Sequence, residues 1–171
     1  NRFEHNRAPA SVDKQTVIRM NRDTLYSFAV VDVSAGATLM IPDAGDRYLS
    51  VMVVNEDHYI NRVLHGEGRY DLTDDDVGSP YAVVAARTLV DPQDPADLAS
   101  VAAIQDQLLL SAAADRPFVL PDYDTEGLDR TRKALLTLAS DMTSFESTFG
   151  RKEDVDPVHH LVGTAAGWGG L

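Results

Sequence analysis

The chain has 171 residues, of which 44% are hydrophobic, so it is long enough to form one domain with a substantial core. Its formal net charge of -12 argues against nucleic acid as a partner, and the lack of cysteine excludes disulfides, zinc–thiolate sites and a thiol nucleophile within the chain. No apolar run approaches the length of a membrane span, and no signal peptide is apparent. For the chain as given we slightly favour the cytoplasm, although a first residue of Asn1 rather than Met leaves the compartment open.

The first two thirds of the sequence favour β-strands. Runs rich in β-branched and aromatic residues are separated by turn signals such as 34–36 and 43–46. The expected strands are 25–33, 37–41, 47–55, 59–64, 69–72 and 81–90. Several of them are apolar on both faces and their connections are short, which favours antiparallel pairing in a sandwich or in a sheet covered by helices. The acidic triplet 74–76 beside Gly78 is interpreted as a solvated loop.

The last third favours helices. Asp94 and Pro95 supply an N-cap and a first-turn proline for a helix that we expect to run to about Ala113. A second helix is expected from Asp124 to Phe149. Its apolar positions recur at helical spacing: Leu128, Leu135, Leu138, Met142, Phe145 and Phe149.

A third, shorter helix is expected to start at 156–157 and to end before Gly167. Runs of strands followed by runs of helices predict an α+β fold, with an antiparallel β-sandwich-like (jelly-roll-like) body and C-terminal helices packed against it. We expect a single domain that is strand-rich over 15–90 and helical over 94–166, followed by the tail 167–171.

A dense polar block stands at the start of the first long strand. Asn21, Arg22, Asp23 and Tyr26 lie between apolar runs, so they are drawn toward the core and need partners there. Two interpretations stay open. In a structural cluster, Arg22 or Arg87 would pair with Asp23. In a binding site, an arginine would be left over for an anionic ligand, because its planar fork can grip a carboxylate through two hydrogen bonds.

Several residues outside this block are further candidates for ligand binding. Arg87 interrupts a long apolar run, so its charge must be paired, must reach solvent or must bind a ligand. Arg47 and Tyr48 follow a turn, and Gln105 falls on the inward side of the first expected helix. Trp168 suits a core plug, an interface anchor or a pocket wall, of which we favour the interface anchor.

Familiar catalytic motifs are missing from the sequence, including a nucleophile elbow, a phosphate-binding loop and a zinc-protease motif. The tripeptide 56–58 puts two carboxylates beside an imidazole, but a metal would need further ligands, so we predict neither a metal site nor a cofactor. Whether the chain is an enzyme stays open. If it is one, Arg22 and Arg87 would bind charge, Asp23 would act as a base or orienter, and Tyr26 would donate a proton.

The polar block is also the strongest part of a family resemblance. The segments 21–27, 42–43 and 45–48 resemble the family called domain of unknown function 1254, and the supporting pieces are 86–88, 104–106 and 163–171. Together they extend the resemblance over nearly the whole chain. In that family this domain is usually followed by a β-rich domain of unknown function 1214, and the tail 167–171 resembles the junction between the two. The resemblance therefore implies a second domain or another chain as a partner, and it implies no particular reaction.

Two functions follow from these patterns, and we rank last a third, a metal-dependent enzyme that uses His58, Asp57 or His65 with a distant carboxylate. The first is binding or transformation of a small polar or anionic organic molecule through the Asn/Arg/Asp/Tyr cluster, which predicts that these side chains converge on one pocket. The alternative is a non-catalytic module of a two-domain or homo-oligomeric assembly, in which the polar cluster is structural. This alternative predicts a large apolar patch near Trp168.

Overall fold

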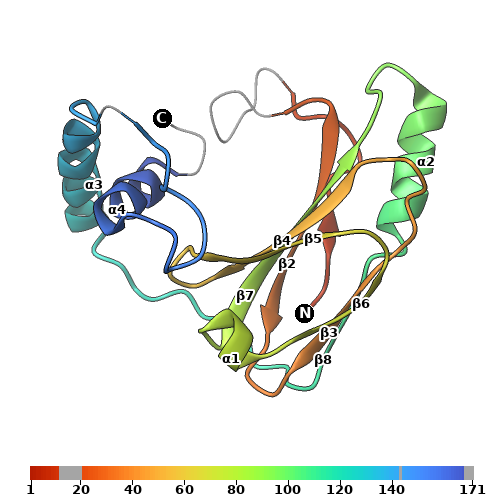
Figure 1. Cartoon of the computed structure of the whole chain (residues 1–171), viewed down its shortest axis with the longest axis horizontal. Helices are drawn as coiled ribbons and strands as arrows, with labels where there is room; N and C mark the ends of the chain where they lie inside the picture. Colours follow the sequence, from red (N-terminus) through yellow and green to blue (C-terminus); the bar gives the residue numbers. More distant parts are fainter. Residues whose placement is uncertain (12–20, 143, 168–171) are drawn as a thin grey trace.

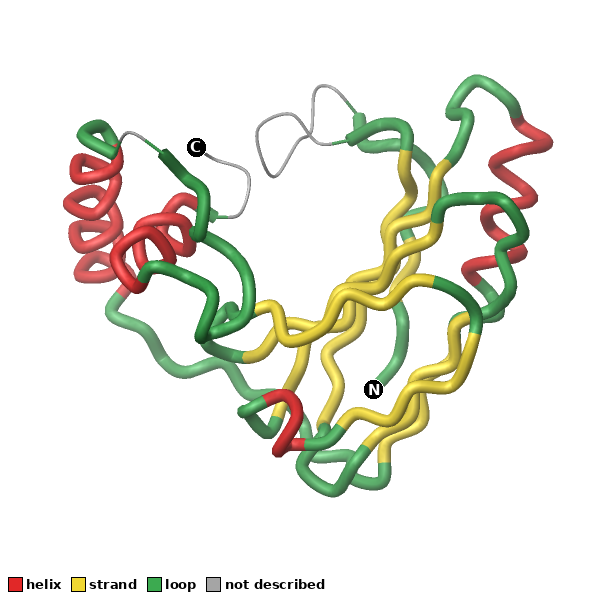
Figure 2. Tube along the Cα trace, in the orientation of Figure 1, coloured by secondary structure: helices red, strands yellow, loops and turns green. Residues whose placement is uncertain are grey.

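The structure, a computed structural model, describes residues 1–11, 21–142 and 144–167 (Figures 1 and 2). These residues form two antiparallel sheets and a set of helices. The five-stranded sheet has the order β1 (Glu4–His5), β2 (Thr24–Asp32), β7 (Tyr81–Leu89), β4 (Leu49–Asn55) and β5 (Ile60–His65). The three-stranded sheet has the order β6 (Gly68–Leu72), β3 (Ala37–Ile41) and β8 (Leu109–Ala112). The helices are α1 (Asp74–Val77), α2 (Pro95–Gln105), α3 (Thr125–Ala139) and α4 (Pro157–Ala166).

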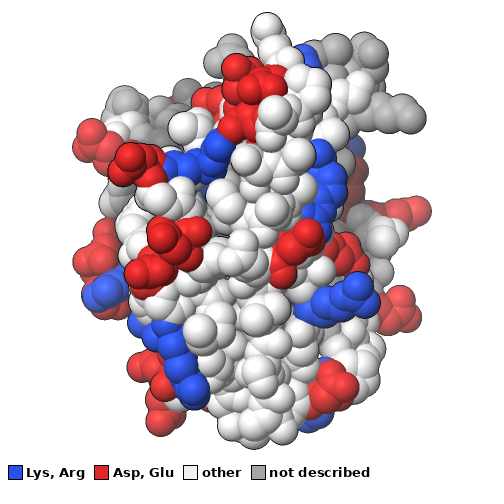
Figure 3. All heavy atoms as spheres, turned by 90° about the vertical axis from the view of Figure 1, so that its right-hand side faces the viewer, with Lys and Arg blue, Asp and Glu red and all other residues white. Residues whose placement is uncertain are grey.

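The six predicted strands are confirmed, each within two residues of its expected bounds. The α+β class is confirmed as well. The two-residue strand β1 was not predicted; it pairs with the middle of β2 and extends the sheet at that edge. Both signs of charge lie on the surface, and Figure 3 shows acidic and basic side chains interspersed on the side of the molecule that faces right in Figure 1.

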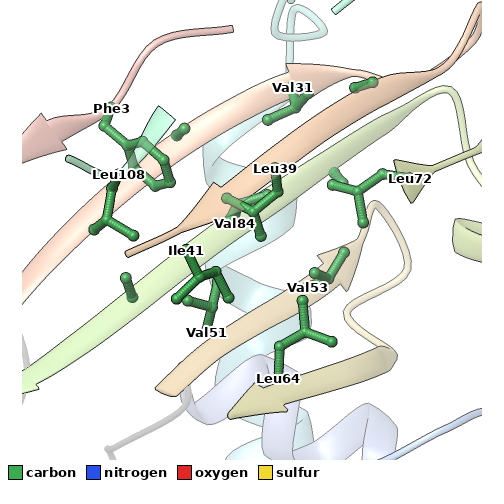
Figure 4. Packing of buried hydrophobic residues seen from close by; sticks show 14 of the residues in the cluster. Phe3, Val31, Leu39, Ile41, Val51, Val53, Leu64, Leu72, Val84 and Leu108 are labelled. Atoms are coloured by element: carbon green, nitrogen blue, oxygen red, sulfur yellow. The ribbon is translucent and has the colours of Figure 1, made fainter. Parts of the chain in front are cut away.

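The core lies between the two sheets. The five-stranded sheet turns Val31, Val53 and Val84 toward Leu39 and Leu72 of the three-stranded sheet, and all five side chains are fully buried (Figure 4). Each such burial is worth about 1.5–3 kcal/mol relative to exposure in water. Because side chains alternate along a strand, the residues between these core positions project from the opposite, outer face of the five-stranded sheet.

Helix α2 begins as predicted but ends earlier. The Asp94 carboxylate accepts a hydrogen bond from the Ala96 amide, and the helix stops at Gln105 instead of Ala113. The chain then forms β8, in which Leu110 is half-buried against the core while Leu109 is exposed. The helix prediction was wrong here because a short apolar run fits a helix and a strand equally well, and the free edge of β3 decided the outcome.

The second predicted helix is also shorter than expected. Helix α3 ends at Ala139, and Ser147 adopts a left-handed backbone conformation with φ of 61°, which is incompatible with a helix reaching Phe149. No residue of α3 is buried, and the helix packs on α4 rather than on a sheet (Figure 1). The expectation of C-terminal helices packed against the sheet body therefore needs correction for α3.

Helix α4 connects this helical pair to the five-stranded sheet. His160 is buried, and its Nε2 and Nδ1 atoms lie 2.9 Å from the Asp57 carbonyl oxygen and 3.0 Å from the Thr148 carbonyl oxygen. At Gly163 the helix comes so close to Thr148 that a Cβ atom would overlap the threonine methyl group. The predicted start of α4 is confirmed, because the Asp156 carboxylate caps it by accepting from two backbone amides.

The acidic triplet 74–76 is part of a one-turn helix, α1, and not of a loop as predicted. The Thr73 hydroxyl accepts a hydrogen bond from the Asp76 amide and donates one to the Asp76 carboxylate. Gly78 ends the turn with a φ of 77°, a conformation that glycine adopts without strain. A capping signal for this helix was therefore present in the sequence: Thr73, Asp76 three residues later, and Gly78.

Candidate functional site

The outer face of the five-stranded sheet brings four polar side chains into one row. Tyr26 of β2 is paired in register with Arg87 of β7, Arg87 with Ser50 of β4, and Ser50 with His65 of β5. Residues paired in this way point to the same side of a sheet, with Cβ atoms about 5 Å apart. We call Tyr26, Arg87, Ser50 and His65 the polar row.

Arg87 is the central feature of the polar row. Its guanidinium carbon lies 5.8 Å from the centre of the Tyr26 ring, a cation–π arrangement. Its Nε atom is buried and makes no hydrogen bond, and no carboxylate of the described residues forms an ion pair with it. Thr24 is the next residue on the same face of β2, and its hydroxyl is likewise buried without a partner. Buried polar groups normally have partners, so this pair of groups marks a place where an acceptor would be stabilised.

At the Ser50–His65 end of the polar row, Tyr48 contacts both residues. The Tyr48 hydroxyl donates a hydrogen bond of 2.9 Å to the Ser50 hydroxyl, and the Tyr48 ring lies 6.2 Å from the His65 ring. Ser50 is 6% exposed, whereas Tyr48 is 45% exposed. Tyr48 was a predicted site residue, whereas Ser50 was not, and His65 was considered only as a metal ligand. Their only signal is the pairing of β4 with β7 and β5, which a single sequence does not reveal.

Beyond the polar row, the same face is apolar. The next row across the sheet contains Phe28, Ala85, Met52 and Val63, and the one after it contains Val30, Val83 and Val54. We call these two sets the apolar rows. Phe28, Val63 and Val83 are 42%, 53% and 41% exposed, and the Phe28 ring stacks on the Tyr26 ring at 5.6 Å with an interplanar angle of 4°.

Arg47 does not belong to the polar row, and its charge is paired elsewhere. The guanidinium bonds to both carboxylate oxygens of Asp97 in α2 and donates a hydrogen bond of 2.7 Å to the Leu89 carbonyl oxygen. These hydrogen bonds raise the pKa of Arg47 and lower the pKa of Asp97 below its usual value. Arg47 therefore fastens α2 to the end of β7.

Gln105 lies on the other side of the sheet. It is fully buried, and its amide nitrogen lies 3.1 Å from the Ser27 hydroxyl and 3.2 Å from the Asn6 carbonyl oxygen. Its side-chain oxygen accepts a hydrogen bond from Arg7. These contacts make Gln105 a link between α2, β2 and the N-terminal segment.

The start of the polar block does not form the predicted ion-pair cluster. Asn21, Arg22 and Asp23 are exposed where β2 begins, and among the described residues Asp23 pairs with neither Arg22 nor Arg87. Among the described residues, the Asp23 backbone does make a contact, since its carbonyl oxygen accepts from the Val90 amide at 2.8 Å. Trp168, with its predicted apolar patch, lies outside the described residues.

A cavity of about 490 Å³ lies between the turn after β4, α1 and residues 151–153. Its walls carry both signs of charge and include Asn61, whose side-chain oxygen is buried without a hydrogen bond. Of the residues predicted to bind or transform an organic ligand, none that the structure describes lines this cavity. In the described ranges, no three His, Asp or Glu side chains gather as metal ligands, and no helix is both long and apolar enough to cross a membrane.

The fold has a relative among solved structures. The crystal structure of the VPA0106 protein from Vibrio parahaemolyticus is similar with a TM-score of 0.69 and 13% sequence identity, over 89% of this chain and 58% of that one. The chain therefore spans less than two thirds of that protein's length, and at this identity the likeness concerns the fold alone. No curated protein matches the chain. Residues 1–112 match the family described as "Protein of unknown function (DUF1254)", and the chain belongs to that family.

Proposed function

We propose that the chain binds a small organic anion on the outer face of the five-stranded sheet, with Arg87 as the residue that holds the negative charge. One observation carries this proposal: the Nε atom of Arg87 is buried without a hydrogen bond. An unpartnered buried donor on a charged group costs more than about 1–3 kcal/mol, and a carboxylate would relieve this cost. Arginine suits this role because its planar group binds carboxylates in a fixed geometry.

The surrounding residues support the same ligand chemistry. The unpartnered Thr24 hydroxyl can donate to the carboxylate beside Arg87, while Tyr26 and Tyr48 offer phenol groups at the two sides of the polar row. Asn21, Arg22 and Asp23 lie where β2 begins, and in our proposal they border the site. If the ligand is also transformed, Asp23 would serve as base or orienter and Tyr26 as proton donor.

The proposal is tested by calorimetric titration with octanoate and its neutral analogue octanamide. We expect octanoate to bind and octanamide to bind at least tenfold more weakly, because a hydrogen bond to a charged group is worth about 1.5–3 kcal/mol. Arg87→Gln should weaken octanoate binding to a similar extent, whereas Arg69→Gln, which removes an exposed arginine from β6, should leave it unchanged. Equal binding of both compounds, or an intact affinity in Arg87→Gln, would contradict the proposal.

The second candidate function is that of a non-catalytic module in a larger assembly, and exposed apolar residues outside the sheet favour it. Val119 and Leu120, between β8 and α3, are 76% and 71% exposed, and Leu128 of α3 is 54% exposed. In this second proposal these side chains are the contact points for a partner, which would remove their apolar area from water. The partner we propose is a second copy of the chain or a second β-rich domain of the type that follows in the resembling family. We also propose that the two sheets are arranged as a sandwich, because both contribute side chains to one core.

Light scattering after size-exclusion chromatography tests this second function. A multiple of the monomer mass of 18.6 kDa would support self-assembly, and the double variant Val119→Ser/Leu120→Ser should then return the mass to that of a monomer. Val158→Ser, an exposed apolar residue on α4, is the matched control and should leave the mass unchanged. A monomer over the whole concentration range would exclude a homo-oligomer.

A further inference from the structure

We infer that the anion bound at Arg87 is an amphipathic carboxylate, a carboxyl group on an extended apolar body, and not a small polar acid. This inference rests on the proposed function and names the ligand class for the same site. Its basis is the arrangement of the two apolar rows, which begin directly beside the polar row and continue along the same strands.

Apolar residues follow Arg87 and Tyr26 along their own strands. Along β7, the outward residues after Arg87 are Ala85 and Val83, and along β2 the outward residues after Tyr26 are Phe28 and Val30. Each step of two residues advances about 6.7 Å, so Val83 lies about 13 Å from Arg87 along the strand. A carboxylate at Arg87 can therefore extend a chain of this length along positions that carry only apolar side chains, of which Phe28, Val30 and Val83 are exposed.

Several side chains of the apolar rows are exposed to solvent. Phe28, Val30 and Val83 are 42%, 39% and 41% exposed, and Val63 at the other side of the first apolar row is 53% exposed. Apolar area of this kind, gathered on one face, is stabilised by removal from water. A small polar acid would bind Arg87 and leave all of it exposed, whereas an alkyl or aromatic body would cover it.

The charged residues around the apolar rows favour a ligand with a single carboxyl group. Within the two apolar rows no residue is charged. The Arg116 guanidinium at the far end of the face is committed to the Asp32 carboxylate and lies over the Tyr81 ring at 5.5 Å. Glu4 stands at the β1 edge, paired with Phe28, where it disfavours a second anionic group. A ligand with a single carboxyl group and an apolar remainder matches this pattern.

A chain-length series on the unmodified protein tests the inference. Butyrate, octanoate and dodecanoate carry the same head group, and each buried methylene should improve the dissociation constant by up to about fourfold. We expect dodecanoate to bind at least tenfold more tightly than butyrate. Val83→Gln should remove most of this gain and leave butyrate binding unchanged. Leu109→Gln, an exposed leucine on the other sheet, is the matched control and should have no effect on either compound.

The outcomes separate this inference from the proposed function. Equal affinities along the series, all of them lost in Arg87→Gln, would overturn the amphipathic ligand and retain the anion site. A failure of every carboxylate to bind would overturn both. A loss of dodecanoate affinity in Leu109→Gln as large as in Val83→Gln would show adsorption without a site and would overturn the inference as well.

Discussion

Asp32 keeps a charged side chain inside the protein. Its carboxylate is 1% exposed, and it accepts hydrogen bonds from the Arg116 guanidinium at 2.9 Å and from the Ser34 hydroxyl at 2.6 Å. The Arg116 hydrogen bonds, followed by that of Ser34, hold the pKa of Asp32 well below its usual value. The carboxylate thereby fastens the segment after β8 to the end of β2.

This lowered pKa makes stability depend on pH in the acidic range. Because the folded state binds the proton less readily than the unfolded chain, the contribution of Asp32 to the free energy of unfolding is complete above the ordinary carboxyl pKa of about 4. It is lost as the pH falls from there toward the lowered pKa. We expect Asp32→Asn to destabilise the protein at pH about 7 and to flatten the decline between pH about 5 and 2, as measured by urea unfolding. A parallel decline in both proteins would contradict this role.

Gln105 provides a second test at the residue scale. Replacement by leucine roughly keeps the volume but leaves the Asn6 carbonyl oxygen without its side-chain donor, while the Ser27 hydroxyl keeps only its contact with His5. Each unsatisfied buried group costs about 1–3 kcal/mol, so we expect Gln105→Leu to lower the free energy of unfolding by at least that amount. Gln107→Leu, two residues on and exposed, should change it by less than about 0.5 kcal/mol. Equal effects would show that the amide bonds carry no special weight.

Part of the candidate site could be predicted from the sequence. Arg87 could be predicted because a charge inside an apolar run needs a reason, and Tyr26 because it shares a polar block. From the sequence, Arg47 is as good a candidate for ligand binding as Arg87, yet in the structure it forms an ion pair with Asp97, 50 residues further along the chain. No local pattern encodes such a distant pair, so the sequence could not separate a ligand-binding arginine from a structural one.

Capping residues predicted the starts of helices more accurately than apolar spacing predicted their ends. The N-caps Asp94 and Asp156 identified the starts of α2 and α4 correctly, because their carboxylates bond the first backbone amides of the same helix. The apolar spacing that suggested a helix up to Phe149 continued past Ala139 without helical backbone. Strand β8 was missed because its ladder partner β3 lies far away in the sequence.

The attachment of α4 gives a prediction at this scale. His160→Phe should keep the ring stacked on Tyr59, now 4.4 Å away, but remove both ring nitrogens and so leave the Asp57 and Thr148 carbonyl oxygens unpartnered. We expect faster amide hydrogen exchange in α4 and a loss of about 1–3 kcal/mol in its protection, with exchange in β7 unchanged.

The matched control is His159→Phe, which removes one bond to the Glu146 carbonyl oxygen at a more exposed position. It should alter exchange in α4 much less than His160→Phe does. If exchange in β7 rose together with that in α4, the helical pair and the sheet would form one cooperative unit, contrary to this expectation.

For the whole molecule, net charge and local ion pairs act in opposite directions on stability. The net charge of -12 means that acidic groups repel one another, and salt stabilises the fold by screening this repulsion. Salt also weakens the attraction within the Arg116–Asp32 and Arg47–Asp97 ion pairs. Both pairs are partly shielded from solvent, so we expect the net repulsion to decide the sign. The thermal midpoint should rise by about 2–4 °C between low salt and about 0.5 M sodium chloride. A fall would show that the ion pairs dominate.

The pairing of β2 with β7 also has a consequence for synthesis. The register joins Thr24 to Leu89, so the central ladder of the large sheet cannot close until the ribosome has released the whole first half of the chain. Until then β2 and β4 exist as apolar segments with open edges, since β7 is the strand that lies between them. Translation pauses that occur before β7 has emerged from the ribosome should therefore increase aggregation of the nascent chain more than pauses that occur after it has emerged.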